Sequence, residues 1–122
     1  MKESSEHVEQ RDVIQWCNIM KYSGVKELGL IFAVPNGGLR NITTAVKLKA
    51  EGVKSGVPDL MLPVSRKDYH GLFIEMKREK SGKMSEMQLQ WRDDLKEQGY
   101  YCVQCRGSAM AISALKYYLD LE

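Results

Sequence analysis

Two carboxylates and one lysine are placed where they could hold a divalent metal ion beside a phosphodiester bond. Asp59 follows Pro58 at the start of a short apolar segment. Glu75 and Lys77 stand two residues apart at the end of the next one. Mg²⁺ and Mn²⁺ prefer carboxylate oxygens, and a lysine can orient a nucleophile or stabilise developing negative charge. If the fold brings them together, these residue types predict metal-dependent phosphodiester hydrolysis.

The two apolar segments have the pattern of a β-hairpin with a long loop. They cover residues 59–64 and 71–77, and the polar segment 65–70 separates them. Because side chains alternate across a strand, Glu75 and Lys77 project from one face, and one hairpin register adds Asp59 to it. The alternative is that Glu75 and Lys77 form the solvated face of an edge strand.

A helix with one polar residue on its apolar stripe is expected after the hairpin. Ser85 and Gln88 have the form of a capping box, so a helix should begin here. Gln88 shares a helical stripe with Met84, Trp91 and Leu95, which places a polar group in line with core-facing side chains. Gln88 therefore needs a partner, and its own helix cap is one candidate.

Helices and strands are expected around this hairpin. Ser4 or Ser5 can cap a first helix that ends near residues 22–24, and its early turns carry Glu6 and Glu9. Acids there can simply favour the positive end of the helix. Residues 28–34 and 100–104 are predicted strands, and Ser108 is expected to cap a last helix.

A basic insert is predicted between residues 35 and 57. Residues 35–38 have turn chemistry, and Asn41 or Thr43 can start a short helix that Gly52 ends. Lys54, with Lys47 and Lys49, gives the insert a basic surface that could contact a substrate backbone or a partner, or could be a solvated helix face.

Composition narrows the class of protein. The 122 residues with 43% hydrophobic content suit one domain with its own core. The net charge is only +2, but ten basic residues face five acidic ones between residues 40 and 83. Such a surface would attract a phosphate backbone without reading bases. There is no membrane-length apolar run and no signal peptide, so we expect a cytoplasmic protein.

Three cysteines are an odd number in such a chain and indicate reduced thiols. Cys102 and Cys105 form a CxxC motif, but a second pair that would complete a zinc site is missing from the sequence. We interpret them, with Cys17, as structural thiols.

Taken together, these motifs resemble the PD-(D/E)xK nuclease superfamily and, more closely, its VRR-NUC family. The matching segments follow the family's order over nearly the whole chain. After an amino-terminal helix with an acid and Gln10, they are Pro35-Asn-Gly-Gly38 with Arg40, Gly56-Val-Pro-Asp-Leu60, Gly71-Leu-Phe-Ile-Glu-Met-Lys77, Lys83-Met-Ser-Glu-Met-Gln88 with Trp91, and Leu95 with Gly99-Tyr100.

The resemblance implies a fold and a metal site. The fold is α/β, a restriction-endonuclease-like αβββαβ core in which helices flank a mixed central sheet, and residues 1–122 are one VRR-NUC domain. Asp59 and Glu75 are expected to hold Mg²⁺ or Mn²⁺ with an acid of the first helix. The family's spacing favours Glu6, and Glu9 remains an alternative.

The resemblance also implies roles around the metal. Gln88 would position the attacking water or Lys77, as an alternative to capping its own helix. The turn at residues 35–38 would border DNA, with Asn36 and Arg40 as phosphate contacts, although an ordinary surface turn explains the same residues. Lys54 is the third candidate for DNA binding.

The expected function is that of a divalent-metal-dependent DNA endonuclease. Small stand-alone members of the family occur in phages, cut branched DNA such as Holliday junctions and work as homodimers, so host-cell cytoplasm is expected if a phage encodes this chain. The alternative is a non-catalytic DNA-binding module with the nuclease fold. A third hypothesis is a redox protein that uses Cys102 and Cys105.

Overall fold

The sheet has four strands, and the two strands of the predicted hairpin lie at its centre. The computed structural model describes residues 5–35 and 42–122. The sheet order is β1-β2-β3-β4, with β1–β2 and β2–β3 antiparallel and β3–β4 parallel. The elements are α1 (Glu6–Tyr22), η1 (Lys26–Leu30), β1 (Phe32–Ala33), α2 (Ile42–Ala50), β2 (Leu60–Leu62), β3 (Leu72–Lys77), α3 (Glu86–Glu97), β4 (Tyr101–Arg106) and α4 (Ser108–Tyr118).

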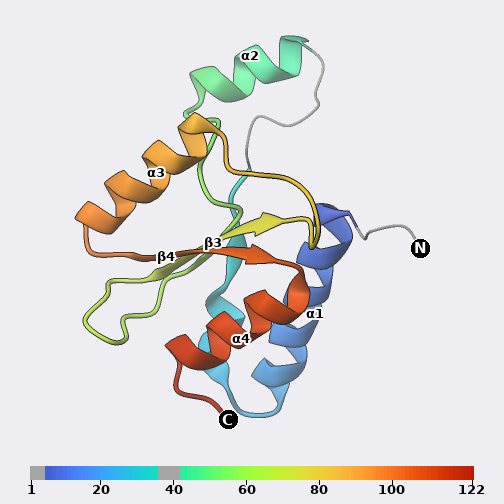
Figure 1. Cartoon of the computed structure of the whole chain (residues 1–122), viewed down its shortest axis with the longest axis vertical. Helices are drawn as coiled ribbons and strands as arrows, with labels where there is room; N and C mark the ends of the chain where they lie inside the picture. The colour runs from blue at the N-terminus through green and yellow to red at the C-terminus, as the bar shows by residue number, and fades with distance from the viewer. Residues whose placement is uncertain (1–4, 36–41) are drawn as a thin grey trace.

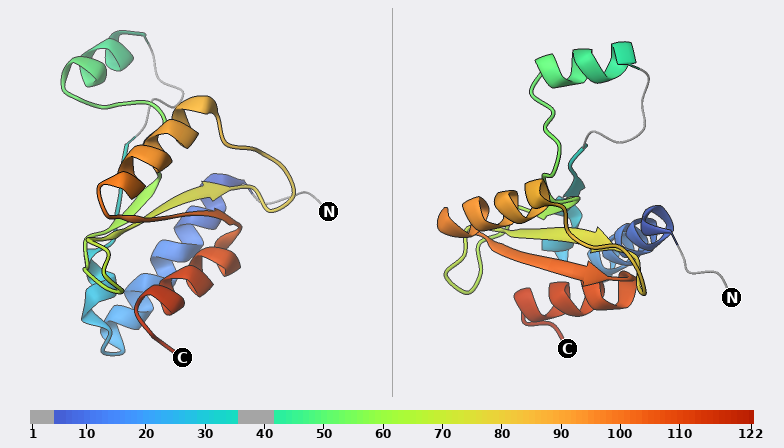
Figure 2. Two further views of the ribbon diagram at one scale, coloured as in Figure 1. Left: turned by 60° about the vertical axis from the view of Figure 1, so that its left-hand side comes forward. Right: turned by 45° about the horizontal axis from the view of Figure 1, so that its top comes forward.

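Helices cover both faces of this mixed sheet. Helices α1 and α4 lie on one face and α3 lies on the other, as Figures 1 and 2 show. Helix α2 stands away from the sheet, and none of its described side chains is buried. The order α1-β1-β2-β3-α3-β4, with α2 inserted after β1, confirms the predicted α/β fold with an αβββαβ core.

The core lies between the sheet and the pair of helices α1 and α4. Leu72, Ile74 and Met76 of β3 point to it, at no more than 1% exposure. Burying a Leu, Ile or Met side chain contributes about 1.5–3 kcal/mol. The other buried residues of the core are Val13, Cys17, Leu28, Leu60, Leu62, Val64, Cys105, Ala111, Leu115, Tyr118 and Leu119.

The register brings the predicted acids together. Leu60 pairs with Ile74 and Leu62 pairs with Leu72, so Asp59, one residue before β2, falls opposite Glu75. Strand β3 lies between β2 and β4, and Glu75 and Lys77 are buried. The edge-strand interpretation of Glu75 and Lys77 is therefore wrong, because α3 covers the face that an edge strand would expose.

Two sequence-based expectations about elements are wrong. Residues 28–34 are not one strand, because η1 occupies Lys26–Leu30 and buries Leu28, and only Phe32–Ala33 pairs with the three-residue β2. Ser108 does not cap α4. Gly107 is the N-cap, and the Ser108 N–H donates to Glu9 Oε2 at 2.6 Å.

Other helix boundaries agree with the sequence. Ser5 caps α1 and accepts the Val8 N–H at 3.2 Å, and the capping box at Ser85 and Gln88 is complete. Helix α2 begins at Ile42, so Thr43 lies inside it, and Asn41 falls outside the described residues. No helix of the described chain is long and apolar enough to cross a membrane.

The cysteines are buried thiols. Cys17, Cys102 and Cys105 are free, and burial raises the pKa of Cys17 and Cys102 to about 11 and that of Cys105 to about 12. A thiol with such a pKa is almost entirely protonated near neutral pH and is a poor nucleophile. This environment favours the structural interpretation over redox chemistry.

Candidate active site

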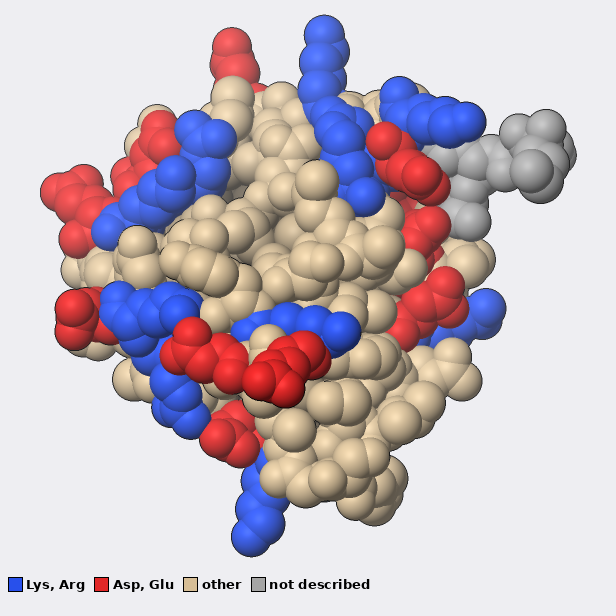
Figure 3. Space-filling model, turned by 60° about the horizontal axis from the view of Figure 1, so that its bottom comes forward, with Lys and Arg blue, Asp and Glu red and all other residues tan. Residues whose placement is uncertain are grey.

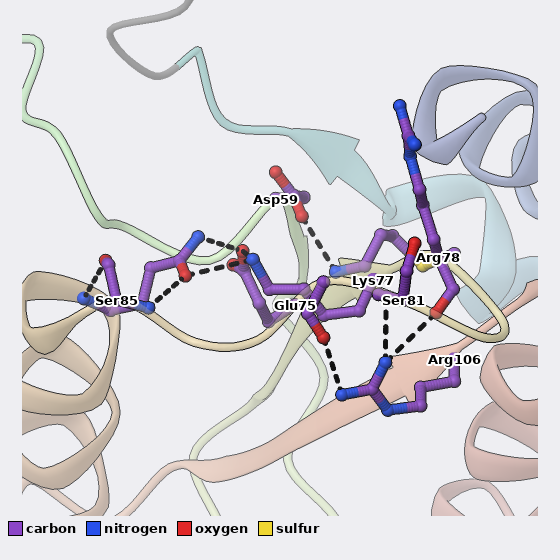
Figure 4. Close-up of polar contacts among 10 residues, drawn as sticks. Asp59, Glu75, Lys77, Arg78, Ser81, Ser85 and Arg106 are labelled. Atoms are coloured by element: carbon purple, nitrogen blue, oxygen red, sulfur yellow. Dashed lines mark hydrogen bonds and ion pairs between the residues drawn. The ribbon is translucent and has the colours of Figure 1, made fainter.

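The Asp59 carboxylate is fixed to the backbone of the central strand. Its Oδ2 atom accepts the Met76 N–H at 2.7 Å (Figure 4). Met76 stands between Glu75 and Lys77 on β3, so this hydrogen bond holds Asp59 beside both residues. Asp59 and Glu75 therefore lie together, as predicted. The position of Asp59 depends on the segment that leads into β2.

Gln88 connects the acid and the amine of β3 to helix α3. Its Nε2 donates to Glu75 Oε1 at 2.6 Å, and its Oε1 accepts the Lys77 ammonium at 3.0 Å. The same Oε1 accepts the Ser85 N–H at 2.9 Å. Gln88 therefore bonds its own helix cap and Lys77 at the same time, because one amide oxygen has two lone pairs.

Electrostatics in the site disfavour two ionised carboxylates. Burial and then the Asp59 charge raise the pKa of Glu75 to about 8, while Lys77 opposes the rise. Burial also raises the pKa of Asp59. Lys77 Nζ lies 3.8 Å from Glu75 Oε1, and Glu75 and Lys77 are only 4% and 7% exposed. With both carboxylates ionised, the site would carry two negative charges against one ammonium, so a bound cation would favour ionisation of both.

One oxygen in this site lacks a partner. Within residues 5–35 and 42–122, Glu75 Oε2 is the buried side-chain oxygen or nitrogen without a hydrogen bond. An unpaired buried carboxylate oxygen costs roughly 1–3 kcal/mol or more, so such groups are rare. A cation would satisfy this oxygen and lower the repulsion from Asp59.

The two candidate acids of α1 have different surroundings. The charge of Glu6 raises the pKa of both Asp59 and Glu75, so Glu6 faces the site. Glu9 is 8% exposed, and its carboxylate accepts the Ser108 N–H at the start of α4. A carboxylate there also interacts favourably with the positive end of that helix. The structure thus separates Glu6, near the site, from Glu9, at a helix end.

The donor set fits a hard divalent cation. Asp59 and Glu75 present carboxylate oxygens from neighbouring strands, and Mg²⁺ is commonly bound through one or two carboxylates with waters and substrate phosphates filling the rest. Among the described residues, no three acids, histidines or cysteines form a ready cluster. Two protein carboxylates would leave the other coordination positions of such an ion to water and phosphate oxygens.

Gly56, which the sequence analysis gave no structural role of its own, brings the segment before Asp59 close to α3. Gly56 has φ +88°, and a Cβ built on it would lie 2.9 Å from Met87 Cβ. On the same segment, the Ser55 carbonyl accepts the Trp91 indole N–H at 3.1 Å. The chain that leads into β2 is thus clamped against α3, the helix that carries Gln88. The signal in the sequence was Gly56 itself, two residues before Pro58.

Of the three residues predicted to bind DNA, the structure describes only Lys54. Lys54 is exposed on the segment between α2 and β2. Asn36 and Arg40 fall outside the described residues. Their proposed contacts with DNA therefore stay predictions.

Comparison with known proteins identifies the family. A solved structure named "VRR_NUC domain protein" superposes with a TM-score of 0.84 at 30% sequence identity, covering 99% of this chain and 93% of that one. A model of the VRR-NUC domain matches residues 3–109. No curated protein sequence matches. The fold and the family model define a nuclease-type, DNA-binding α/β domain. The chain belongs to the VRR-NUC domain family.

The close approach at Gly56 makes a specific prediction. Gly56→Ala should lower the free energy of unfolding by about 2–4 kcal/mol, because a left-handed φ costs about 1–2 kcal/mol and the Met87 clash adds to it. The control is Gly52→Ala, since Gly52 has φ +103° but no atom within 4 Å of its added Cβ. Urea unfolding measures both variants. Equal losses would show that the contact with α3 is not a constraint.

Proposed function

We propose that this protein is a divalent-metal-dependent DNA endonuclease of the PD-(D/E)xK type. The observation that carries the proposal is the buried Glu75 next to the partly buried Asp59, because one oxygen of Glu75 has no partner although a lysine lies beside it. A purely structural ion pair would satisfy its buried oxygens, whereas Glu75 Oε2 has no hydrogen-bond partner here. Carboxylates kept together against repulsion are typical of sites that bind a cation or shift protons.

The residues divide the work as their contacts indicate. Asp59 and Glu75 would hold Mg²⁺ or Mn²⁺, with Glu6 facing the same site. A bound ion would neutralise charge on the scissile phosphate and lower the pKa of a water. Lys77 is held by Gln88 and can stabilise negative charge that develops on the phosphate. Gln88 fixes Glu75 and Lys77 relative to each other, so it positions both.

DNA is the proposed substrate. The charge asymmetry of residues 40–83 supports it, together with the exposed lysines Lys47, Lys49 and Lys54 at the α2 end of the molecule. On the face at the base of Figure 1, which Figure 3 brings forward, acidic and basic side chains are interspersed around a broad uncharged area. We propose that the DNA lies along the α2 end of the molecule, where Lys47, Lys49 and Lys54 are exposed.

The finer properties follow from the resemblance. They are selectivity for branched DNA such as Holliday junctions, a homodimeric state and a phage-type origin. Cutting two symmetric strands suits a twofold dimer, because each protomer then supplies one active site. The projecting α2, with Val46 64% exposed, offers surface that a second protomer could cover.

A substrate panel tests the activity. Labelled linear duplex, flap, fork and four-way junction DNA are incubated with the protein and Mn²⁺, Mg²⁺ or EDTA. We expect metal-dependent cleavage, fastest on the junction. Glu75→Gln should reduce the rate by at least about 10²-fold, because it removes an anionic ligand.

The control for this panel is Glu97→Gln, which removes a charge from an exposed position at the end of α3. It should cleave at the parent rate. Parent-rate cleavage by folded Glu75→Gln would rule out the mechanism. A parent protein that binds DNA but never cuts it would instead support the non-catalytic DNA-binding module.

The two acids of α1 should respond oppositely to substitution. Glu9→Ala should lower the free energy of unfolding by about 1–2 kcal/mol, because it removes the cap of α4, while the folded variant keeps cleaving. Glu6→Ala should change stability by less than about 0.5 kcal/mol and slow cleavage. Denaturant unfolding and cleavage rates measure both effects. Loss of cleavage with folded Glu9→Ala, but not with Glu6→Ala, would assign the catalytic acid to Glu9.

A further inference from the structure

Arg106 makes an unusual set of contacts at the end of β4. Its Nη1 donates to the carbonyl oxygens of Arg78 and Ser81 at 3.2 and 2.9 Å, and its Nη2 donates to the Gly82 carbonyl at 2.7 Å. All three acceptors belong to the loop between β3 and α3 (Figure 4). One side chain therefore holds three residues of this loop, at positions 78, 81 and 82.

The loop that Arg106 holds lies next to the candidate active site. It follows Lys77 directly and leads to Ser85 and the capping box of Gln88. A Cβ built on Gly82, which has φ +83°, would lie 3.7 Å from Glu6 Oε1 and 3.7 Å from Lys77 Cδ. The Gly82 backbone thus packs against the acid and the amine that face the site.

Arg106 lies on β4, directly beside the strand that carries Glu75 and Lys77. Arg106 pairs with Lys77 in the parallel β3–β4 register, and the Gly107 N–H donates to the Lys77 carbonyl at 3.2 Å. The position of the loop is therefore set relative to Lys77 rather than to a distant part of the fold.

The held loop is cationic and faces solvent. Arg78, Lys80 and Lys83 are exposed, against Glu79 in the same segment. In Figure 4 the Arg78 side chain extends away from Arg106. Arg106 itself turns its guanidinium toward the protein, and its fixed fork of donors is committed to backbone carbonyls. Its role is therefore one of placement, and Arg78, Lys80 and Lys83 are the exposed cationic side chains of the loop that it holds.

We propose that Arg106 is a positioning residue that holds the β3–α3 loop beside the active site, so that Arg78, Lys80 and Lys83 grip the DNA phosphates that flank the scissile bond. The inference rests on the proposed nuclease function and adds the element that seats the substrate. It separates substrate binding, which depends on the loop, from metal binding, which depends on Asp59 and Glu75.

The test compares Arg106→Lys and Arg106→Gln with the parent and with Lys26→Gln. Lysine keeps the charge but lacks the planar fork, so it cannot bond three carbonyls as arginine does. The control removes one charge from exposed Lys26 in η1, which follows the end of α1 opposite to Glu6. Circular dichroism and thermal unfolding establish that each variant is folded.

Three readouts decide the proposal. For both Arg106 variants, KM for a labelled four-way junction should rise about three- to tenfold, with kcat within about twofold. Junction binding in EDTA should weaken similarly, and the slope of log Kd against log salt should become shallower by about one per lost phosphate contact. Hydrogen exchange of residues 78–83 should accelerate. The Lys26 control should match the parent in all three.

Unchanged KM, Kd and salt slope in folded Arg106 variants would overturn the proposal while leaving the nuclease function intact. A fall in kcat with unchanged KM would overturn it too, because it would place Arg106 in the chemical step. A parent protein that neither cuts nor binds DNA would instead overturn the proposed function, and with it the basis of the inference.

Discussion

The burial of Glu75 beside Asp59 is the constraint on which the rest of the structure depends. Burial of Glu75, and then repulsion from the nearby Asp59 carboxylate, raises the pKa of Glu75. The fold keeps them together with the Met76 N–H, the Gln88 amide and the Lys77 ammonium, all on or against β3. An unfavourable arrangement of this kind persists only where the surrounding structure enforces it, and such arrangements cluster at functional sites.

The central strand, the segment before β2 and helix α3 together hold these two carboxylates in place. Strand β3 is central, so its hydrophobic face can bury Leu72, Ile74 and Met76 against α1 and α4 while its other face carries the charged groups under α3. The segment before β2 is clamped to α3 at Gly56, which links Asp59 to the helix that supplies Gln88. Loops complete the site, since Arg106 ties the chain that joins β3 to α3.

Patterns among neighbouring residues predicted the features that short-range interactions determine. Strand alternation placed Glu75 with Lys77, and the capping box placed the start of α3 at Ser85. Contacts distant in sequence were not predictable in this way. The Glu9 carboxylate that caps α4 replaces the expected Ser108 cap across 99 residues of chain. The segment expected as one strand at 28–34 begins instead in a 3₁₀ helix that buries Leu28, and only Phe32–Ala33 pairs with the short β2.

The central claim is that Asp59 and Glu75 share one divalent cation beside Lys77. Anomalous scattering from a crystal soaked in MnCl₂ tests it directly. The account predicts a manganese peak about 2.0–2.3 Å from an oxygen of each carboxylate, with Glu75 Oε2 as a ligand. A well-ordered site with no peak there at saturating Mn²⁺, or with the two carboxylates turned apart and a peak elsewhere, would contradict it.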